Sequence, residues 1–77
     1  MRIENNLEQR ICFLIETTLG IKGVNIDSSQ ENFQAWDSLG YLSVLSAIED
    51  EFQIDINQDN INNFGTVENI ITEINGK

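Results

Sequence analysis

Apolar residues recur at α-helical spacing in three separate stretches of this chain, and this pattern constrains the fold more than any other feature. From about Glu4 to Leu19 they return every three or four positions, which predicts an amphipathic helix. Its stripe consists of Ile3, Leu7, Ile11, Leu14, Ile15 and Thr18. Gly20 then stands where glycine commonly ends a helix. Cys12 and Phe13 fall off the stripe, on the outer side of this helix.

A second helix is predicted from Asp37 to about Phe52. The Asp37 carboxylate can accept hydrogen bonds from the free N–H groups of the first turn. We expect a buried stripe of Leu39, Leu42, Leu45, Ile48 and Phe52, with Tyr41 and Val44 beside it. Trp36, just before this helix, is more readily explained as a plug in the core than as a lining for a ligand.

The third helix is predicted to begin at Thr66 as its N-cap and to end at Asn75-Gly76. Val67, Ile70, Ile71 and Ile74 would face inward. Residues 20–36 form a loop tacked down by apolar anchors, and residues 53–64 a polar loop with one short helical turn near Gln58 to Asn62. The sequence therefore predicts an all-α fold, a small antiparallel bundle of three main helices and one short helix, in a single domain spanning 1–77.

Composition excludes most catalytic chemistry. The 77 residues hold 13 acidic and four basic side chains, no histidine and one cysteine, for a net charge of −9. Without histidine there is no Ser-His or Cys-His nucleophile and no imidazole ligand for a metal, and the single Cys12 cannot form an internal disulfide. We expect a protein that is not an enzyme, binds no metal and no nucleic acid, and meets partners with basic patches.

Two further features bear on location and metal binding. No apolar run could span a bilayer and the first residues lack a signal peptide's apolar stretch, so we expect a cytoplasmic monomer with a reduced thiol. The stretch 55–59 resembles the opening of an EF-hand loop. Asn60 and Thr66 stand where that loop needs Gly and a bidentate Glu, so a calcium site is rejected.

Ser38 is the residue with the most chemical interest. It lies at the first position of the second predicted helix, where free N–H groups and the positive end of the helix dipole favour a phosphate. No histidine can activate its hydroxyl, so it suits an acceptor that a separate enzyme modifies. Serines are common at helix starts, and the residues alone favour a plain structural role.

Three segments resemble the acyl carrier proteins. These are Asp37-Ser38-Leu39 with the acidic helix end Ala47–Ile54, the first helix Leu7–Ile21, and the last-helix entry Phe64–Ile70. The segments follow one another in the family's order and at similar spacing, and the resemblance extends from about residue 3 to residue 75. The resemblance implies that Ser38 carries a 4′-phosphopantetheine arm, donated by coenzyme A and installed by a phosphopantetheinyl transferase. It also implies that Asp37 caps the helix and helps the transferase recognise the site.

The arm's thiol would hold an acyl group as a thioester, which implies further partners: an acyl- or aminoacyl-loading ligase and a downstream acyltransferase, synthase or thioesterase. We expect the partner surface at Leu39, Tyr41, Leu42, Glu49 and Asp50. An aminoacyl or peptidyl carrier is an alternative within this class. A helical adaptor or regulatory module whose Ser38 is never modified is an alternative outside it.

The chain departs from carriers of fatty-acid synthesis, which usually have acids early in the second helix. Here that region has Gly40, Tyr41 and Ser43, and the acids gather later, at Glu49–Glu51. The sequence therefore resembles stand-alone carriers of specialised pathways, such as polyketide, non-ribosomal peptide or surface-glycan biosynthesis.

Overall fold

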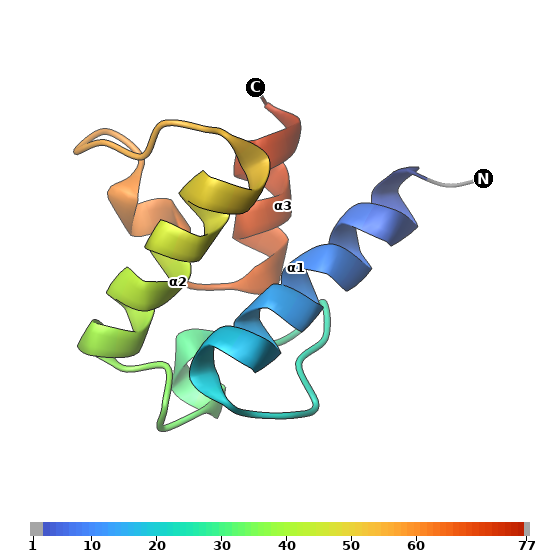
Figure 1. Cartoon of the computed structure of the whole chain (residues 1–77), viewed down its shortest axis with the longest axis vertical. Coiled ribbons are helices and arrows are strands. Elements are labelled where there is room, and N and C mark those ends of the chain that lie inside the picture. Colours follow the sequence, from blue (N-terminus) through green and yellow to red (C-terminus); the bar gives the residue numbers. More distant parts are fainter. Residues whose placement is uncertain (1–2, 77) are drawn as a thin grey trace.

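A computed structural model describes residues 3–76 of the chain as a small helical protein (Figure 1). Its α-helices are α1 (Ile3–Leu19), α2 (Ser38–Phe52) and α3 (Val67–Asn75). Two 3₁₀ helices, η1 (Gln30–Asn32) and η2 (Ile61–Asn63), lie in the connections. α1 packs against both α2 and α3 and runs in the opposite direction to them. The predicted all-α bundle is confirmed, and no strand occurs among residues 3–76.

The three long helices begin and end close to the predicted residues, whereas the short ones differ. The helical turn predicted near Gln58 to Asn62 lies slightly later in the chain, as η2 at Ile61–Asn63. η1 was not predicted at all. Nowhere between residues 3 and 76 is a helix both long and apolar enough to cross a bilayer.

The stripe of α1 is narrower than predicted. Leu7, Ile11 and Ile15 are buried, whereas Leu14 is half-buried and Thr18 is exposed. The side chain of Ile3 lies outside the described residues. Gly20 ends the helix with a φ of 69°, a left-handed conformation that glycine adopts without strain.

The long connection from α1 to α2 is held down by polar and apolar contacts. The Glu16 carboxylate accepts the N–H groups of Gly23 and Val24 at 3.0 and 3.1 Å. Val24 is buried and Trp36 is only 1% exposed, so the predicted core plug is confirmed. These anchors fix the path of the chain as it enters α2.

Both connections contain the same side-chain-capped turn. In residues 25–28 the amide oxygen of Asn25 accepts the N–H of Asp27, and Ser28 caps the N–H of Asn25. In residues 57–60 the same two hydrogen bonds occur, with Asn57 accepting and Asn60 capping. Such turns satisfy backbone groups locally. They place η1 and η2 beside α2.

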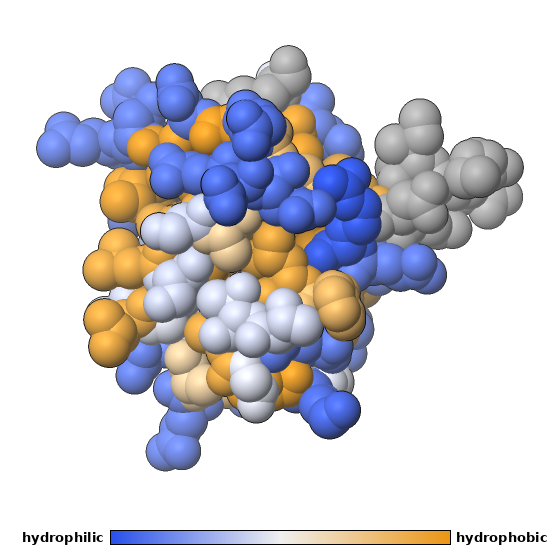
Figure 2. Space-filling view, viewed as in Figure 1, coloured by the Kyte–Doolittle hydropathy of each residue, from blue (hydrophilic) through white to orange (hydrophobic). Residues whose placement is uncertain are grey.

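The buried face of α2 includes Leu45 and Ile48, as predicted, but differs from the prediction at the start of the helix. Its buried residues are Gly40, Val44, Leu45 and Ile48, whereas Leu39 is 75% and Leu42 53% exposed. The first turn packs on the preceding loop through Gly40, which leaves Leu39, one position back, facing solvent. The predicted burial of Leu39 and Leu42 is wrong. Figure 2 shows apolar side chains at the edge of the molecule where α2 lies.

Candidate functional site

Asp37 sets the start of α2. Its backbone is extended, and its carboxylate accepts the Gly40 N–H at 2.9 Å, as an N-cap does. Its carbonyl accepts the Tyr41 N–H at 2.7 Å, which closes the first turn. Asp37 is therefore the predicted helix cap, and Ser38 is the first helical residue.

Ser38 is exposed at the N-terminus of this 15-residue helix, and the first turn contains no acidic residue. Free N–H groups and the helix dipole favour negative charge at this end. The hydroxyl therefore suits a phosphodiester: it is accessible, and the helix end behind it stabilises an anion.

Close packing holds the backbone on both sides of Ser38. Trp36 is buried, and among the described residues its indole N–H has no hydrogen-bond partner. Gly40 lies against the loop so tightly that a Cβ there would collide with the Ala35 carbonyl oxygen and would come within 3.0 Å of the Leu19 Cδ2. Glycine at this position permits that approach, and the two contacts direct Ser38 outward.

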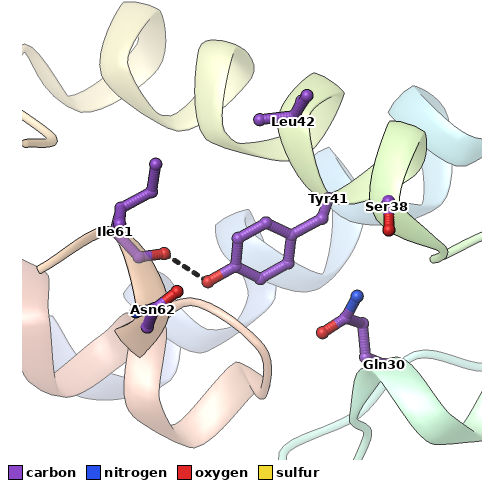
Figure 3. A pocket seen from close by; sticks show the side chains of 6 residues that line it. All are labelled: Gln30, Ser38, Tyr41, Leu42, Ile61 and Asn62. Carbon is purple, nitrogen blue, oxygen red and sulfur yellow. Dashed lines mark hydrogen bonds between the residues drawn. The ribbon is translucent and has the colours of Figure 1, made fainter. Parts of the chain in front are cut away.

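Ser38 lies on the rim of an open groove of about 430 Å³ formed by η1, α2 and η2 (Figure 3). Its lining residues are Gln30, Ser38, Tyr41, Leu42, Ile61 and Asn62. The Ser38 hydroxyl and the Gln30 amide point toward each other across it. Gln30 and Asn62 were missed from the sequence because they lie on short 3₁₀ helices that no periodicity marks.

Tyr41 forms the middle of the groove. It is half-buried, its hydroxyl donates a hydrogen bond to the Ile61 carbonyl, and the same oxygen accepts the Phe64 N–H at 3.1 Å. The side chain thus bridges α2 to η2, and only part of its ring faces outward.

The acids of α2 lie at the end of the helix opposite Ser38. The Glu49 carboxylate accepts the Ile56 N–H at 3.2 Å, and Glu51 pairs with Arg10 at 3.0 Å. The Arg10 guanidinium also lies 4.6 Å from the Phe52 ring centroid. Asp50 is exposed. Glu49 and Asp50 are thus separated from Leu39, Tyr41 and Leu42 by most of α2.

Cys12 and Phe13, neighbours on α1, differ in how far their side chains are exposed. Phe13 is 66% exposed, as predicted. Cys12 is half-buried against the core, so its prediction as an outer residue is wrong. Burial, with smaller contributions from Glu8 and Glu16, raises the pKa of the Cys12 thiol to about 11. The thiol is therefore a poor nucleophile at neutral pH.

Taken together, these features define a class of protein that presents an exposed hydroxyl at the start of a helix on a small helical support. The sequence has no histidine, and residues 3–76 hold no cluster of three or more side chains suited to a metal ion. The exposed Ser38 hydroxyl fits an acceptor for another enzyme's chemistry.

Comparison with known proteins identifies the family. A family model described as "Phosphopantetheine attachment site" matches residues 9–74. The chain is also 36% identical over 76 residues to the acyl carrier protein of Buchnera aphidicola subsp. Schizaphis graminum, with 95% of each chain covered. This chain belongs to the acyl carrier protein family. Members are carriers rather than enzymes, and their cofactor is covalent 4′-phosphopantetheine.

Proposed function

We propose that Ser38 is the attachment residue for 4′-phosphopantetheine and that the chain presents an acyl group to partner enzymes in the cytoplasm. The supporting observation is the exposed hydroxyl at the capped start of α2, within the span that the family model matches. The arm, when bound, supplies a thiol that holds the acyl group as a thioester.

Attachment requires chemistry that a phosphopantetheinyl transferase supplies. The Ser38 Oγ–P bond forms as the P–O bond of the coenzyme A pyrophosphate breaks. The hydroxyl proton passes to a base of the transferase, and 3′-phosphoadenosine 5′-phosphate leaves. Asp37 fixes the helix start that places the hydroxyl, and the free N–H groups at that end stabilise the new negative charge.

Intact-mass measurement tests this assignment. Incubation with coenzyme A and a broad-specificity phosphopantetheinyl transferase should add one phosphopantetheine to the wild-type protein and none to Ser38→Ala. Ser43→Ala is the matched control, because Ser43 is also exposed on α2, and it should be modified like the wild type. No gain on the wild type, or an equal gain on Ser38→Ala, contradicts the assignment.

We further propose that loading ligases, acyltransferases, synthases or thioesterases of a specialised biosynthetic pathway dock around the start of α2. Leu39 and Leu42 expose apolar surface there, with the outer part of the Tyr41 ring beside them. Apart from the N-cap Asp37, no acid lies at that end of the helix, and Glu49 and Asp50 would contact a partner only at the far end. An apolar contact of this kind is little affected by salt.

Two exposed apolar residues provide a matched test of the docking surface. Leu39→Ser should lower the transferase kcat/KM, whereas Phe13→Ser on α1 should leave it unchanged. The wild-type rate should also change little between low and high salt. Equal effects of the two substitutions would contradict a docking surface at Leu39. A steep fall of kcat/KM with salt would favour docking through the acids instead.

A further inference from the structure

The groove beside Ser38 has a mixed lining, in which apolar surface predominates and two side-chain amides supply polar groups. Its lining includes the side-chain amides of Gln30 and Asn62, and neither has a hydrogen-bond partner among the described residues. Gln30 is fixed by its backbone, since its N–H donates to the Gly65 carbonyl at 2.9 Å. In Figure 3 the Gln30 amide lies near Ser38, and the Asn62 amide lies on the other side of the Tyr41 ring.

A ligand tethered at Ser38 would meet these amides at high local concentration. A 4′-phosphopantetheine arm contains two amide groups, which can pair with side-chain amides as donor and acceptor. The groove therefore matches the polar part of the arm.

Tyr41 separates this groove from the core. Its ring lines the groove on one side and packs against the buried cluster on the other. Its hydroxyl is held by Ile61 and Phe64, 20 and 23 residues away in sequence.

The core behind Tyr41 is closely filled. Val44 on α2, Phe64 after η2 and Val67 on α3 are fully buried in one hydrophobic cluster. To pass from Ser38 into that cluster, a chain would have to displace the Tyr41 ring and break both hydrogen bonds of its hydroxyl. Breaking these partly buried hydrogen bonds without replacing them is unfavourable.

We propose that the groove holds the amide-bearing arm and that Tyr41 bars the core to the cargo. The acyl group then stays in solvent, and the substrate class of this carrier is short-chain acyl groups. A long apolar chain left in water is penalised at every methylene, so a carrier of this form suits short cargo. This inference rests on the proposed attachment at Ser38.

A series of cargo lengths tests it. The holo protein and its acetyl, butyryl and octanoyl thioesters are compared by thermal unfolding and by the methyl NMR signals of Val44 and Val67. All four forms should unfold within about 1 °C of one another, with unchanged core signals. A chain that entered the core would raise Tm by about 5 °C or more. Such a rise, or shifted core methyls, with the octanoyl form overturns the inference.

Substitutions at Tyr41 sharpen the test. Tyr41→Ala should admit the octanoyl chain and gain several degrees on acylation, whereas Tyr41→Phe keeps the ring and should gain less. The wild-type length series decides the question alone if Tyr41→Ala does not fold. For the arm, Gln30→Leu should reduce the NMR contacts between arm and protein. Gln34→Leu, an exposed glutamine outside the groove lining, should not.

Intact mass separates the two ways of failing. A wild-type protein that takes no arm overturns the proposed attachment and this inference with it. A protein that takes the arm on Ser38 but shelters the octanoyl chain overturns only the inference. Equal loss of NMR contacts between arm and protein in Gln30→Leu and Gln34→Leu also contradicts the proposal that the groove holds the arm.

Discussion

At the scale of single residues, Asp37 and Ser38 divide the work of the site. Ser38 offers the hydroxyl, while Asp37 accepts the Gly40 N–H and so fixes where the helix begins. Asp37 also places a carboxylate next to the hydroxyl that we propose as the attachment point. Its cap contributes to folding, and its charge is available for recognition.

Substitution at Asp37 can separate these two roles. Asparagine caps helices about as well as aspartate, so Asp37→Asn should leave the unfolding free energy within about 0.5 kcal/mol of wild type, whereas Asp37→Ala should lose about 1 kcal/mol. Both should lower the transferase kcat/KM by about tenfold, because both remove the charge-assisted hydrogen bond that the Asp37 carboxylate would accept from the transferase. Urea unfolding and initial rates measure the two effects. A normal rate for Asp37→Asn would mean that only the cap matters.

Cys12 should not compete with the arm's thiol. A pKa of about 11 instead of the ordinary 9.0 leaves about a hundredth of the usual thiolate at neutral pH. Iodoacetamide at pH 8 should therefore label the holo protein once, on the arm, and the apo protein only slowly. Rapid labelling of the apo protein at Cys12 would contradict this.

The same pKa shift gives a pH dependence. Because the folded protein holds the Cys12 proton more tightly than the unfolded chain, the thiol's contribution to stability is intact below about pH 9 and is lost as the pH rises toward 11. Cys12→Ala should lessen that decline in urea unfolding. Identical slopes for the two proteins between pH 9 and 11 would show that other groups cause it.

At the scale of elements, periodicity predicted the long helices because each buries a repeating apolar stripe, as α1 does with Leu7, Ile11 and Ile15. It misplaced Leu39 and Leu42 because the start of α2 packs on a loop rather than on a helix. It missed η1 and Gln30 because a side-chain-capped turn and a bond to Gly65 place them. Ser38 itself was found from the motif, and its groove was not.

Gly40 is where helix and loop constrain each other. At an exposed helical position, Gly→Ala would stabilise by up to about 1 kcal/mol. Here the added Cβ meets the Ala35 carbonyl, so Gly40→Ala should destabilise by about 1–3 kcal/mol through overpacking. Thermal unfolding measures the change, and Ser46→Ala, exposed on the same helix, should be neutral or slightly stabilising. A more stable Gly40→Ala would show that the loop yields easily.

At the scale of the whole molecule, charge is the dominant property. Thirteen acidic residues face four basic ones, and among the described residues the ion pair of Arg10 with Glu51 is the single salt bridge. Both partners are about half exposed, so this pair is worth at most about 1 kcal/mol. Repulsion among the acids therefore opposes the compact state. In the proposed docking near Ser38 a partner would contact apolar residues, while the net charge acts at longer range.

Screening should consequently stabilise the fold. Raising NaCl from about 0.01 to 0.5 M shortens the Debye length from about 30 Å to less than 8 Å, so Tm should rise by several degrees. Magnesium and calcium should act equally at matched concentrations, since residues 55–66 lack the glycine and glutamate of a calcium loop. The double variant Glu31→Gln/Asp50→Asn, which neutralises two exposed acids, should flatten the salt dependence. A calcium response that saturates at micromolar concentration, with none for magnesium, would reveal a specific site and contradict simple screening.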